Sequence, residues 1–389
     1  MKIKLRQAFD LQMGKTPARN RPDYWNGDHK WISIADIGNA GKFLTKTKES
    51  ITAAGIDGSG IKVVPQGTVI MSFKLSIGKT AITSEDMYTN EAIMAFIDNG
   101  KFAVDPNYLY HLCCGTNWTA GTNKAVMGLT LNKATLLEKE IPLPDINEQH
   151  EIATKLDKID ALITERQQQL ELIDQAVKSR FIELFGDPLS NDKGWQKVVI
   201  TEMCHAIFGG GTPSKSHPEY FAGSIPWISP KDMKSTVIND SIDHITEEAI
   251  AHSTTNLVPA NSVLMVIRSG ILKHTLPVAI NSLPVTINQD MKAFVPNETV
   301  KTAFLMHLFK AIENDVLAGV RGVTADNIDF KAFQKRTIIV PPLELQEQFA
   351  AFVEQTDKSK YYSSLSFRYC QAAANTYRQE WMTCRTSDF

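Results

Sequence analysis

The chain has 389 residues, of which 43% are apolar and 22% are charged, and its formal net charge is −2. This composition excludes a mainly disordered chain and suggests two or three domains. No run of about 18 apolar residues could cross a bilayer, and the N-terminus lacks a secretory signal, so we expect a cytoplasmic protein with five reduced cysteines. Because DNA-binding proteins are usually basic, any DNA-binding surface must be local.

The first half of the chain opens with a glycine-bearing turn and a W-I-S segment within residues 14–36, GKTPARNRPDYWNGDHKWISIAD. The runs GTVIMSF (67–73) and AIMAFI (92–97) are short and apolar and are bounded by Gly, Pro and Asn, which predicts strands. We expect the first domain at residues 1–145.

A long helix follows, which we place at residues 146–186. Apolar or long side chains recur at alternating steps of four and three, at Ile152, Leu156, Ile159, Ile163, Arg166, Leu170, Ile173, Val177, Arg180 and Leu184. This period of 3.5 is typical of a coiled coil, which needs a partner helix. The 33 residues from Ile152 to Leu184 would span about 50 Å. Gly186-Asp187-Pro188 ends the helix. The alternative is a core helix of one large domain.

The second half repeats the first. Residues 210–232, GGTPSKSHPEYFAGSIPWISPKD, match residues 14–36 at an offset of 196, with ten of 23 positions identical. The runs SVLMVIR (262–268) and MKAFVP (291–296) again predict strands. Between these matched frames the two halves diverge. We expect a second domain at residues 187–342.

A C-terminal helical region is expected at residues 343–389. Phe349, Val353 and Thr356 begin a second seam, but Lys360 and Ser363 then occupy it. From about residue 360 the tail is rich in serine and aromatic residues and shows little heptad order. We therefore expect an atypical tail and an incomplete second coil.

Signatures of catalysis are missing from the sequence. Gly78-Lys79-Thr80 is no P-loop, because the earlier glycine that the motif requires is replaced by Phe73. Metal-binding motifs and the Asx-Pro-Pro-aromatic signature of amino-methyltransferases are also absent. Acidic pairs such as Glu85-Asp86 read as solvated charges. We expect no catalytic residue, no metal site and no cofactor.

The duplicated GxTP…Y…W-I-S frame and the helix ending in FIELFGDP resemble the specificity (S) subunit of Type I restriction-modification enzymes over about residues 1–360. The resemblance implies an α+β fold of two strand-rich target recognition domains in tandem. They would be joined by long coiled-coil helices, central and C-terminal, packed antiparallel. Each domain would read one part of a split double-stranded DNA site.

The resemblance also implies partners. The helices would dock two modification (M) subunits, which methylate adenine, and restriction (R) subunits would join through the complex. S-adenosylmethionine, ATP and Mg²⁺ would belong to those subunits. A spacer of about 50 Å suits half-sites about one to one and a half helical turns apart, at about 34 to 36 Å per turn.

Phosphate contacts come from Lys and Arg on glycine-bearing loops, and base contacts from side chains that reach a groove. The candidate DNA-binding residues are Lys15, Arg19, Lys74, Lys79, Asn123, Lys124, Lys215, Lys231, Arg268, Lys273, His274 and Arg321. Three matched pairs keep positive charge and suit the DNA backbone: Arg19/Lys215, Lys74/Arg268 and Lys124/Arg321. The unmatched candidates suit base choice: Lys79, Asn123, Lys273 and His274. We expect Trp31 and Trp227 to be buried packing residues.

Two other functions remain open from the sequence. One is a self-contained DNA methyltransferase or endonuclease whose catalytic centre carries no recognisable motif. The other is a scaffold whose paired domains bind a protein that mimics DNA.

Overall fold

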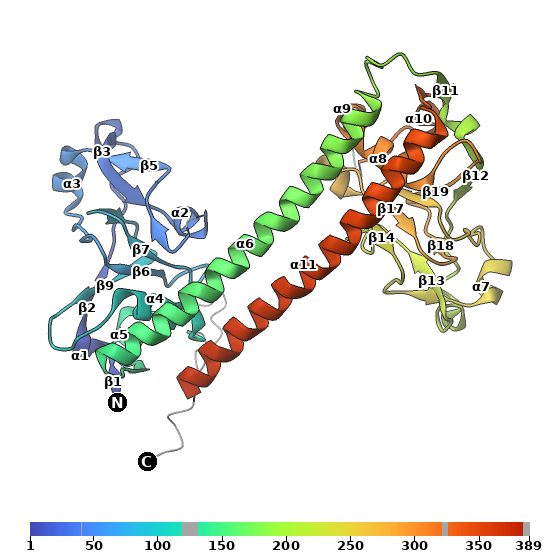
Figure 1. Cartoon of the computed structure of the whole chain (residues 1–389). Helices are drawn as coiled ribbons and strands as arrows, with labels where there is room; N and C mark the ends of the chain where they lie inside the picture. Colours follow the sequence, from blue (N-terminus) through green and yellow to red (C-terminus); the bar gives the residue numbers. More distant parts are fainter. Residues whose placement is uncertain (40, 119–130, 321–325, 384–389) are drawn as a thin grey trace. The chain divides into compact units, whose positions relative to one another are not determined.

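The computed structural model describes residues 1–39, 41–118, 131–320 and 326–383. The chain divides into two compact units (Figure 1). Unit 1 comprises Met1–Gln167 and Leu365–Phe389, and unit 2 comprises Gln168–Ser364. Helices α6 (Ile146–Phe185) and α11 (Leu343–Thr383) therefore contribute one part to each unit.

Unit 1 is built on a five-stranded sheet and a three-stranded sheet. The larger has the order β2 (Phe9–Met13), β9 (Ile93–Asp98), β6 (Val69–Ser72), β7 (Thr80–Thr83) and β4 (Phe43–Leu44), and the smaller β5 (Glu49–Ile51), β3 (Trp25–Ile32) and β8 (Tyr88–Thr89). A further pair joins β1 (Lys2–Lys4) to β10 (Glu140–Pro142). The helices are α1 (Leu5–Ala8), α2 (Ile34–Asn39), α3 (Ala53–Ser59), α4 (Pro106–Gly115) and α5 (Lys133–Leu137), with a 3₁₀ turn η1 (Pro22–Tyr24).

Unit 2 repeats this plan. Its larger sheet has the order β12 (Cys204–Gly209), β19 (Met291–Pro296), β16 (Val263–Val266), β17 (Val278–Asn281) and β14 (Val237–Ile238), and its smaller sheet β15 (His244–Ile245), β13 (Ile225–Ile228) and β18 (Thr286–Ile287). The pair β11 (Lys197–Val199) and β20 (Thr337–Ile339) completes it. The helical elements are α7 (Glu247–Ala251), α8 (Thr302–Ala311), α9 (Glu313–Ala318), α10 (Phe330–Phe333), η2 (Ile200–Met203), η3 (Pro218–Phe221) and η4 (Gly270–Lys273).

Matching strands hold matching places in the two sheets, as the sequence repeat predicts. In each unit the edge strand pairs parallel with its neighbour, β4 with β7 and β14 with β17, while the other pairs of that sheet are antiparallel. The four predicted apolar runs form β6, β9, β16 and β19. Both domains are therefore α+β and arose from one frame.

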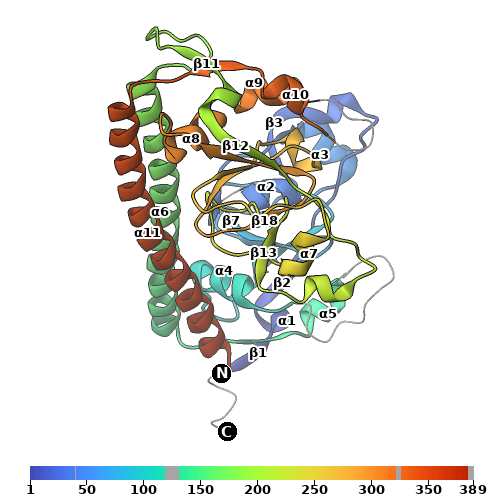
Figure 2. The same ribbon diagram turned by 90° about the vertical axis from the view of Figure 1, so that its right-hand side faces the viewer.

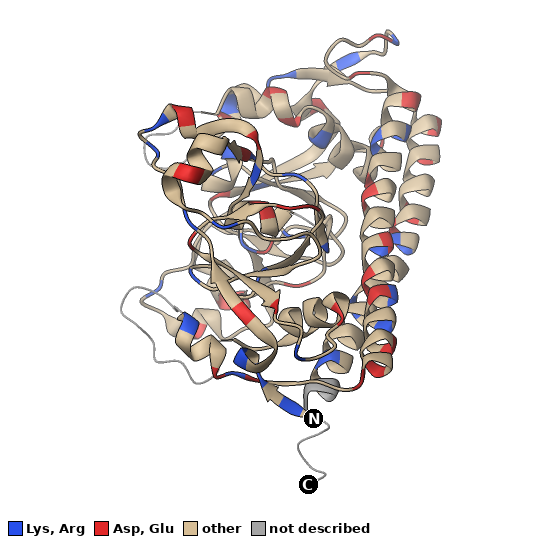
Figure 3. Ribbon diagram, turned by 90° about the vertical axis from the view of Figure 1, so that its left-hand side faces the viewer, with Lys and Arg blue, Asp and Glu red and all other residues tan. Residues whose placement is uncertain are grey.

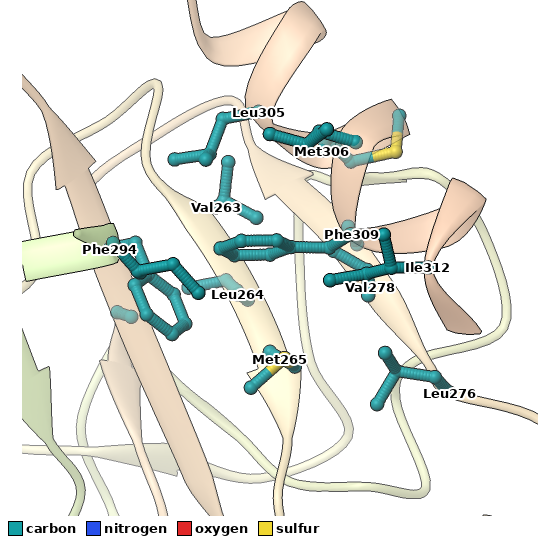
Figure 4. Packing of buried hydrophobic residues seen from close by; sticks show 14 of the residues in the cluster. Val263, Leu264, Met265, Leu276, Val278, Phe294, Leu305, Met306, Phe309 and Ile312 are labelled. Carbon is teal, nitrogen blue, oxygen red and sulfur yellow. The ribbon is translucent and has the colours of Figure 1, made fainter. Parts of the chain in front are cut away.

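The central strands are buried on both faces, which explains their continuous apolar sequence. In β6, Val69 and Met71 pack with residues of α4, while Ile70 packs with Ile32 of β3. In unit 2, Val263, Leu264 and Phe294 are fully buried, and Phe309 of α8 packs edge-on against Phe294 (Figure 4). Burying each such side chain contributes about 1.5 to 3 kcal/mol.

Helix α6 has the predicted seam. None of the ten predicted seam residues is exposed, whereas Leu162 and Leu172, off the seam, are 43% and 62% exposed. The helix ends at Phe185 because Gly186 takes a φ of +73°, which favours glycine.

Helix α11 runs antiparallel to α6 within each unit (Figures 1 and 2). In unit 2, Asp174 of α6 contacts Lys360 of α11, and Phe185 of α6 contacts Phe349 of α11. The residue numbers rise along α6 as they fall along α11, so the two helices are antiparallel. In unit 1, Asp160 of α6 pairs with Arg378 of α11. The predicted pair of long packed helices is confirmed.

The expectation of an incomplete second coil was wrong, because α11 continues through the tail to Thr383. Its shielded residues keep alternating steps of four and three, at Phe349, Val353, Thr356, Lys360, Ser363, Phe367, Cys370, Ala374 and Tyr377. Lys360 is tolerated in this seam because its ammonium lies 2.5 Å from the Asp174 carboxylate. Polar residues at two seam positions hid the pattern.

A buried glutamine fixes the start of each long helix. The Gln149 side chain accepts from the Asp105 N–H (2.9 Å) and donates to the Ala103 and Pro144 carbonyls (3.0 Å each). Gln346 accepts from the Lys301 N–H (2.9 Å) and donates to Thr299 and Pro341 in the same way. Both side chains are fully buried, so each satisfies backbone groups that would otherwise be orphaned.

The two units hold the helices by different side chains. In unit 1, Asp157 accepts from Lys42 (2.6 Å) and contacts the His111 ring (2.7 Å), and Arg378 pairs with both oxygens of Asp160 at 2.8 Å. In unit 2 the contact is an aromatic cluster of Phe181, Phe185, Phe304 and Phe349, with ring centroids 4.8 to 5.8 Å apart.

Candidate nucleic-acid interface

Three loops leave each five-stranded sheet at the same end of its strands. In unit 1 the register aligns Met13 with Met94, Met94 with Met71, and Met71 with Thr80. The GxTP loop after β2, the turn before β9 and the loop 73–79 between β6 and β7 therefore leave the sheet side by side. We call this the loop edge of unit 1.

The loop edge of unit 2 is built the same way. Gly209, Lys292, Met265 and Val278 are aligned across β12, β19, β16 and β17. The second GxTP loop, the turn before β19 and the loop 267–277 follow from these ends. Each unit thus presents loops from one rigid sheet, an arrangement common in binding sites.

The GxTP loops are held tightly at their first glycine. A Cβ at Gly14 would overlap the Thr89 carbonyl, and one at Gly210 would overlap that of Asn288. Trp31 and Trp227 donate from Nε1 to the carbonyls of Lys15 and Gly211, at 3.0 Å in both units. Trp31 is buried, as expected, but Trp227 is only half-buried. Both indoles position the loop and serve as packing residues.

The candidate cations of unit 1 lie in different surroundings. Lys15 donates from Nζ to the Ser59 carbonyl (3.2 Å), and Lys74 lies 5.2 Å from the Phe73 ring centroid. Arg19 pairs with Glu49, which raises the pKa of Arg19 and lowers that of Glu49 through their hydrogen bonds. Its guanidinium lies 3.8 Å over the Trp25 ring. Lys79 is exposed in loop 73–79.

Unit 2 pairs several of its candidates with carboxylates. Arg268 contacts Asp290 at 2.5 Å and Lys273 lies 3.7 Å from Asp326. Lys231 pairs with Asp243 at 2.6 Å, and the pKa of Lys231 is raised because of that hydrogen bond. Lys215 and His274 are exposed.

The loop edges bring together Lys15, Lys74 and Lys79 in unit 1, and Arg268, Lys273 and His274 in unit 2, while Lys215 lies in the second GxTP loop. The candidates Asn123, Lys124 and Arg321 lie outside the described residues. Leu131, the first described residue after one gap, donates its N–H to the Phe73 carbonyl (3.2 Å), and Asn327 bridges to Arg268.

Glu91 and Gln289 lie at the loop edges and were not among the residues predicted from the sequence. The hydroxyl of Thr16 donates to Glu91, and the hydroxyl of Thr212 donates to Gln289. These partners occupy matched turns before β9 and β19. An alignment of the two halves through Asn90 and Asn288 would have placed Glu91 opposite Gln289, directly after an asparagine that both halves keep.

The described part of the chain contains no group of three or more His, Cys, Asp or Glu side chains able to hold a metal. None of its helices is long and apolar enough to span a membrane. Its four described cysteines, including buried Cys113, are free.

Comparisons with known proteins give a consistent family. The Type I restriction modification DNA specificity domain matches residues 1–172 and 192–361. The chain is 37% identical over 225 residues to the Type I restriction enzyme EcoR124I/EcoR124II specificity subunit of Escherichia coli, covering 56% of this chain and 55% of that subunit. It is 24% identical over 374 residues to the MjaIX specificity subunit of Methanocaldococcus jannaschii, covering 90% and 85%.

Solved structures share the fold. A chain from a study of complex assembly and conformational transition of the type I R-M system superposes with a TM-score of 0.61 at 18% identity, covering 98% of this chain and 96% of that one. The S subunit from M. genitalium gives a TM-score of 0.59 at 14% identity, with the same coverage. With two matched domains, paired long helices and this family match over most of its length, the chain belongs to the specificity subunits of Type I restriction-modification systems, the non-catalytic DNA-binding components.

Proposed function

We propose that the chain reads a bipartite DNA site, with one half-site for each of the target recognition domains at residues 1–145 and 187–342. The observation that carries this proposal is the common strand order and register of the two sheets, which present unlike loops at matched edges. A common frame suits contacts to the regular DNA backbone, and unlike loops suit the choice of different bases.

Charge at the loop edges supports the division of roles. Lys74 and Arg268 keep a cation at the same place after β6 and β16 and serve as phosphate contacts. Lys79, Lys273 and His274 have no matched partner in the other half and would contact base edges. In the free protein Arg268 and Lys273 are held by carboxylates, so DNA phosphates would replace or share those partners.

The long helices serve as the docking surface for two methyltransferase subunits. Acidic and basic residues are interspersed along both helices (Figure 3), which also carry exposed apolar residues such as Leu172, Tyr362 and Tyr369. Exposed aromatic and aliphatic side chains of this kind mark protein interfaces. The docked subunits would bring S-adenosylmethionine chemistry, and restriction subunits would bring ATP and Mg²⁺.

Selection from a random duplex library tests the proposal. The full chain, alone and with a cognate methyltransferase subunit, should enrich duplexes with two short defined segments separated by a gap of fixed length. Its binding should weaken steeply with salt, because phosphate contacts release counterions. Enrichment of one continuous segment, or of none, would count against a bipartite reader.

Helix length provides the second arm of this experiment. Four residues added near Gln168 in α6 and four near Leu365 in α11 lengthen each helix by about 6 Å and keep the seam nearly in phase. The gap between the enriched segments should grow by about two base pairs. An unchanged gap would show that the helices do not set the spacing.

A further inference from the structure

Glu91 and Gln289 occupy the same place in the two units. Each side chain accepts a hydrogen bond from the threonine of its GxTP loop, Thr16 or Thr212. Each follows an asparagine, and both are exposed at their loop edge. The threonines are identical between the halves, whereas their partners are not.

The backbone of both turns is fixed by equivalent bonds. The N–H of Asn90 donates to the Ile32 carbonyl (3.0 Å), and that of Asn288 to the Ile228 carbonyl (2.9 Å). The Asn90 side chain accepts from the Ala92 N–H (3.0 Å), as Asn288 does from Asp290 (3.1 Å). The two positions therefore share their backbone geometry and differ in their side chains, since Gln289 also donates to Asp290 (3.4 Å) where unit 1 has Ala92.

A positively charged residue, kept in both halves of the chain, lies beside each turn. The N–H of Phe73 donates to the Ala92 carbonyl (3.0 Å), and that of Ile267 to the Asp290 carbonyl (2.8 Å). These bonds bring the next residues, Lys74 and Arg268, against the turn. A common cation next to a variable hydrogen-bonding group is the arrangement expected where one group positions the DNA and the other reads it.

The chemistry of the variable group indicates what it reads. A glutamate only accepts hydrogen bonds and is repelled by phosphate, so at a DNA surface it suits the N4 amino group of cytosine. A glutamine both donates and accepts, and pairs with N7 and N6 of adenine. We propose that Glu91 selects cytosine in the half-site of unit 1 and that Gln289 selects adenine at the matched position of the other half-site. This inference rests on the proposed function, since it requires the loop edges to face DNA.

Exchanging the two residues tests the inference with little risk to folding, because both side chains are exposed and the threonine hydroxyl can donate to a carboxylate or an amide oxygen. In duplex selection with the full chain, alone and with a cognate methyltransferase subunit, E91Q should change one cytosine to adenine in one half-site. Q289E should make the reverse change in the other half-site. Each change should shift the preference at that base pair by ~10-fold or more, with all other positions and the gap unchanged.

Matched controls distinguish this local effect from a change of charge. E85Q, at the opposite end of the unit 1 sheet, and Q196E, on the exposed segment before β11, should leave selection unaltered. Unaltered selection by E91Q and Q289E would overturn the inference while leaving bipartite reading intact. A wild-type chain that selects no bipartite site would overturn both. Uniform weakening by E91Q without a changed base would also overturn it, by showing that Glu91 only supports the GxTP loop through Thr16.

Discussion

The two units hold the same pair of helices by contrasting chemistry at matched positions. His111 and His307 are equivalent residues of α4 and α8, yet His111 lies among carboxylates and His307 packs 5.2 Å from the Phe349 ring. Arg378 of α11 pairs with Asp160 of α6 in unit 1, whereas Phe181 of α6 packs against Phe349 of α11 in unit 2. The duplicated frame thus preserved backbone geometry while the side chains that fill it diverged.

Thr236 holds in unit 2 the place that Lys42 holds in unit 1. Both residues precede the edge strand, and their carbonyls accept equivalent bonds from Ile82 and Ile280. Unit 2 has a cavity of about 660 Å³ lined by Thr236, Phe181, His307 and Asp357 among others. In unit 1, Lys42 pairs with Asp157 and Arg378 pairs with Asp160. Ionic attachment should therefore respond to salt, and aromatic attachment should respond to lost volume.

The largest expected effect is on the aromatic attachment. Phe349→Ala should lower the free energy of unfolding of unit 2 by about 3 to 5 kcal/mol, because it leaves a cavity among Phe181, Phe185 and His307. Urea unfolding followed by hydrogen exchange in each unit measures this. Phe352→Ala, at a half-buried position of the same helix, should cost less than half as much. Equal losses would contradict the central role of the cluster.

The stability of the two units should respond differently to acid because of His307 and His111. Burial lowers the pKa of His307 to about 4, with a further contribution from Lys310. Because the unfolded chain takes up this proton at about pH 6.5, the stability of unit 2 falls as pH drops below that value, by up to about 3 kcal/mol at pH 4.

The pKa of His111 is also lowered by burial, but Asp157 and Asp160 oppose the shift. The loss from His111 in unit 1 should therefore be smaller. Unfolding between pH 7 and pH 4 measures both, and H307Q should remove most of the histidine-dependent loss in unit 2. Retention of the full pH dependence in H307Q would assign it to groups of unit 2 other than His307.

The smallest effect is expected from the ionic attachment. Arg378→Met removes a bidentate pair from Asp160 and should cost unit 1 about 1 to 2 kcal/mol. The difference should shrink in 0.5 M NaCl, since part of this interaction is screened. Lys358→Met, which breaks an exposed pair with Glu354, should cost no more than about 0.5 kcal/mol. A salt-independent loss in R378M would show that packing of the arginine stem dominates.

Local sequence patterns were sufficient to predict much of the fold. The repeated frame predicted two equivalent sheets because identical Gly, Thr, Pro and Trp positions impose the same turns, and the 3.5-residue period of α6 predicted a partner helix. The matched cations Lys74 and Arg268 were also found from the sequence, because they follow recognisable strands.

Contacts between distant segments were decided only by the tertiary structure. Glu91 joins Thr16 across 75 residues and Arg378 joins Asp160 across 218, and neither partner carries a local signal. The seam of α11 includes Lys360 and Ser363, two polar residues that do not suggest helix packing in the sequence. Only the structure shows that Asp174 of α6 pairs with Lys360. Helical period and turn chemistry are properties of neighbouring residues, whereas the choice between an ionic and an aromatic contact depends on which distant residues the fold brings together.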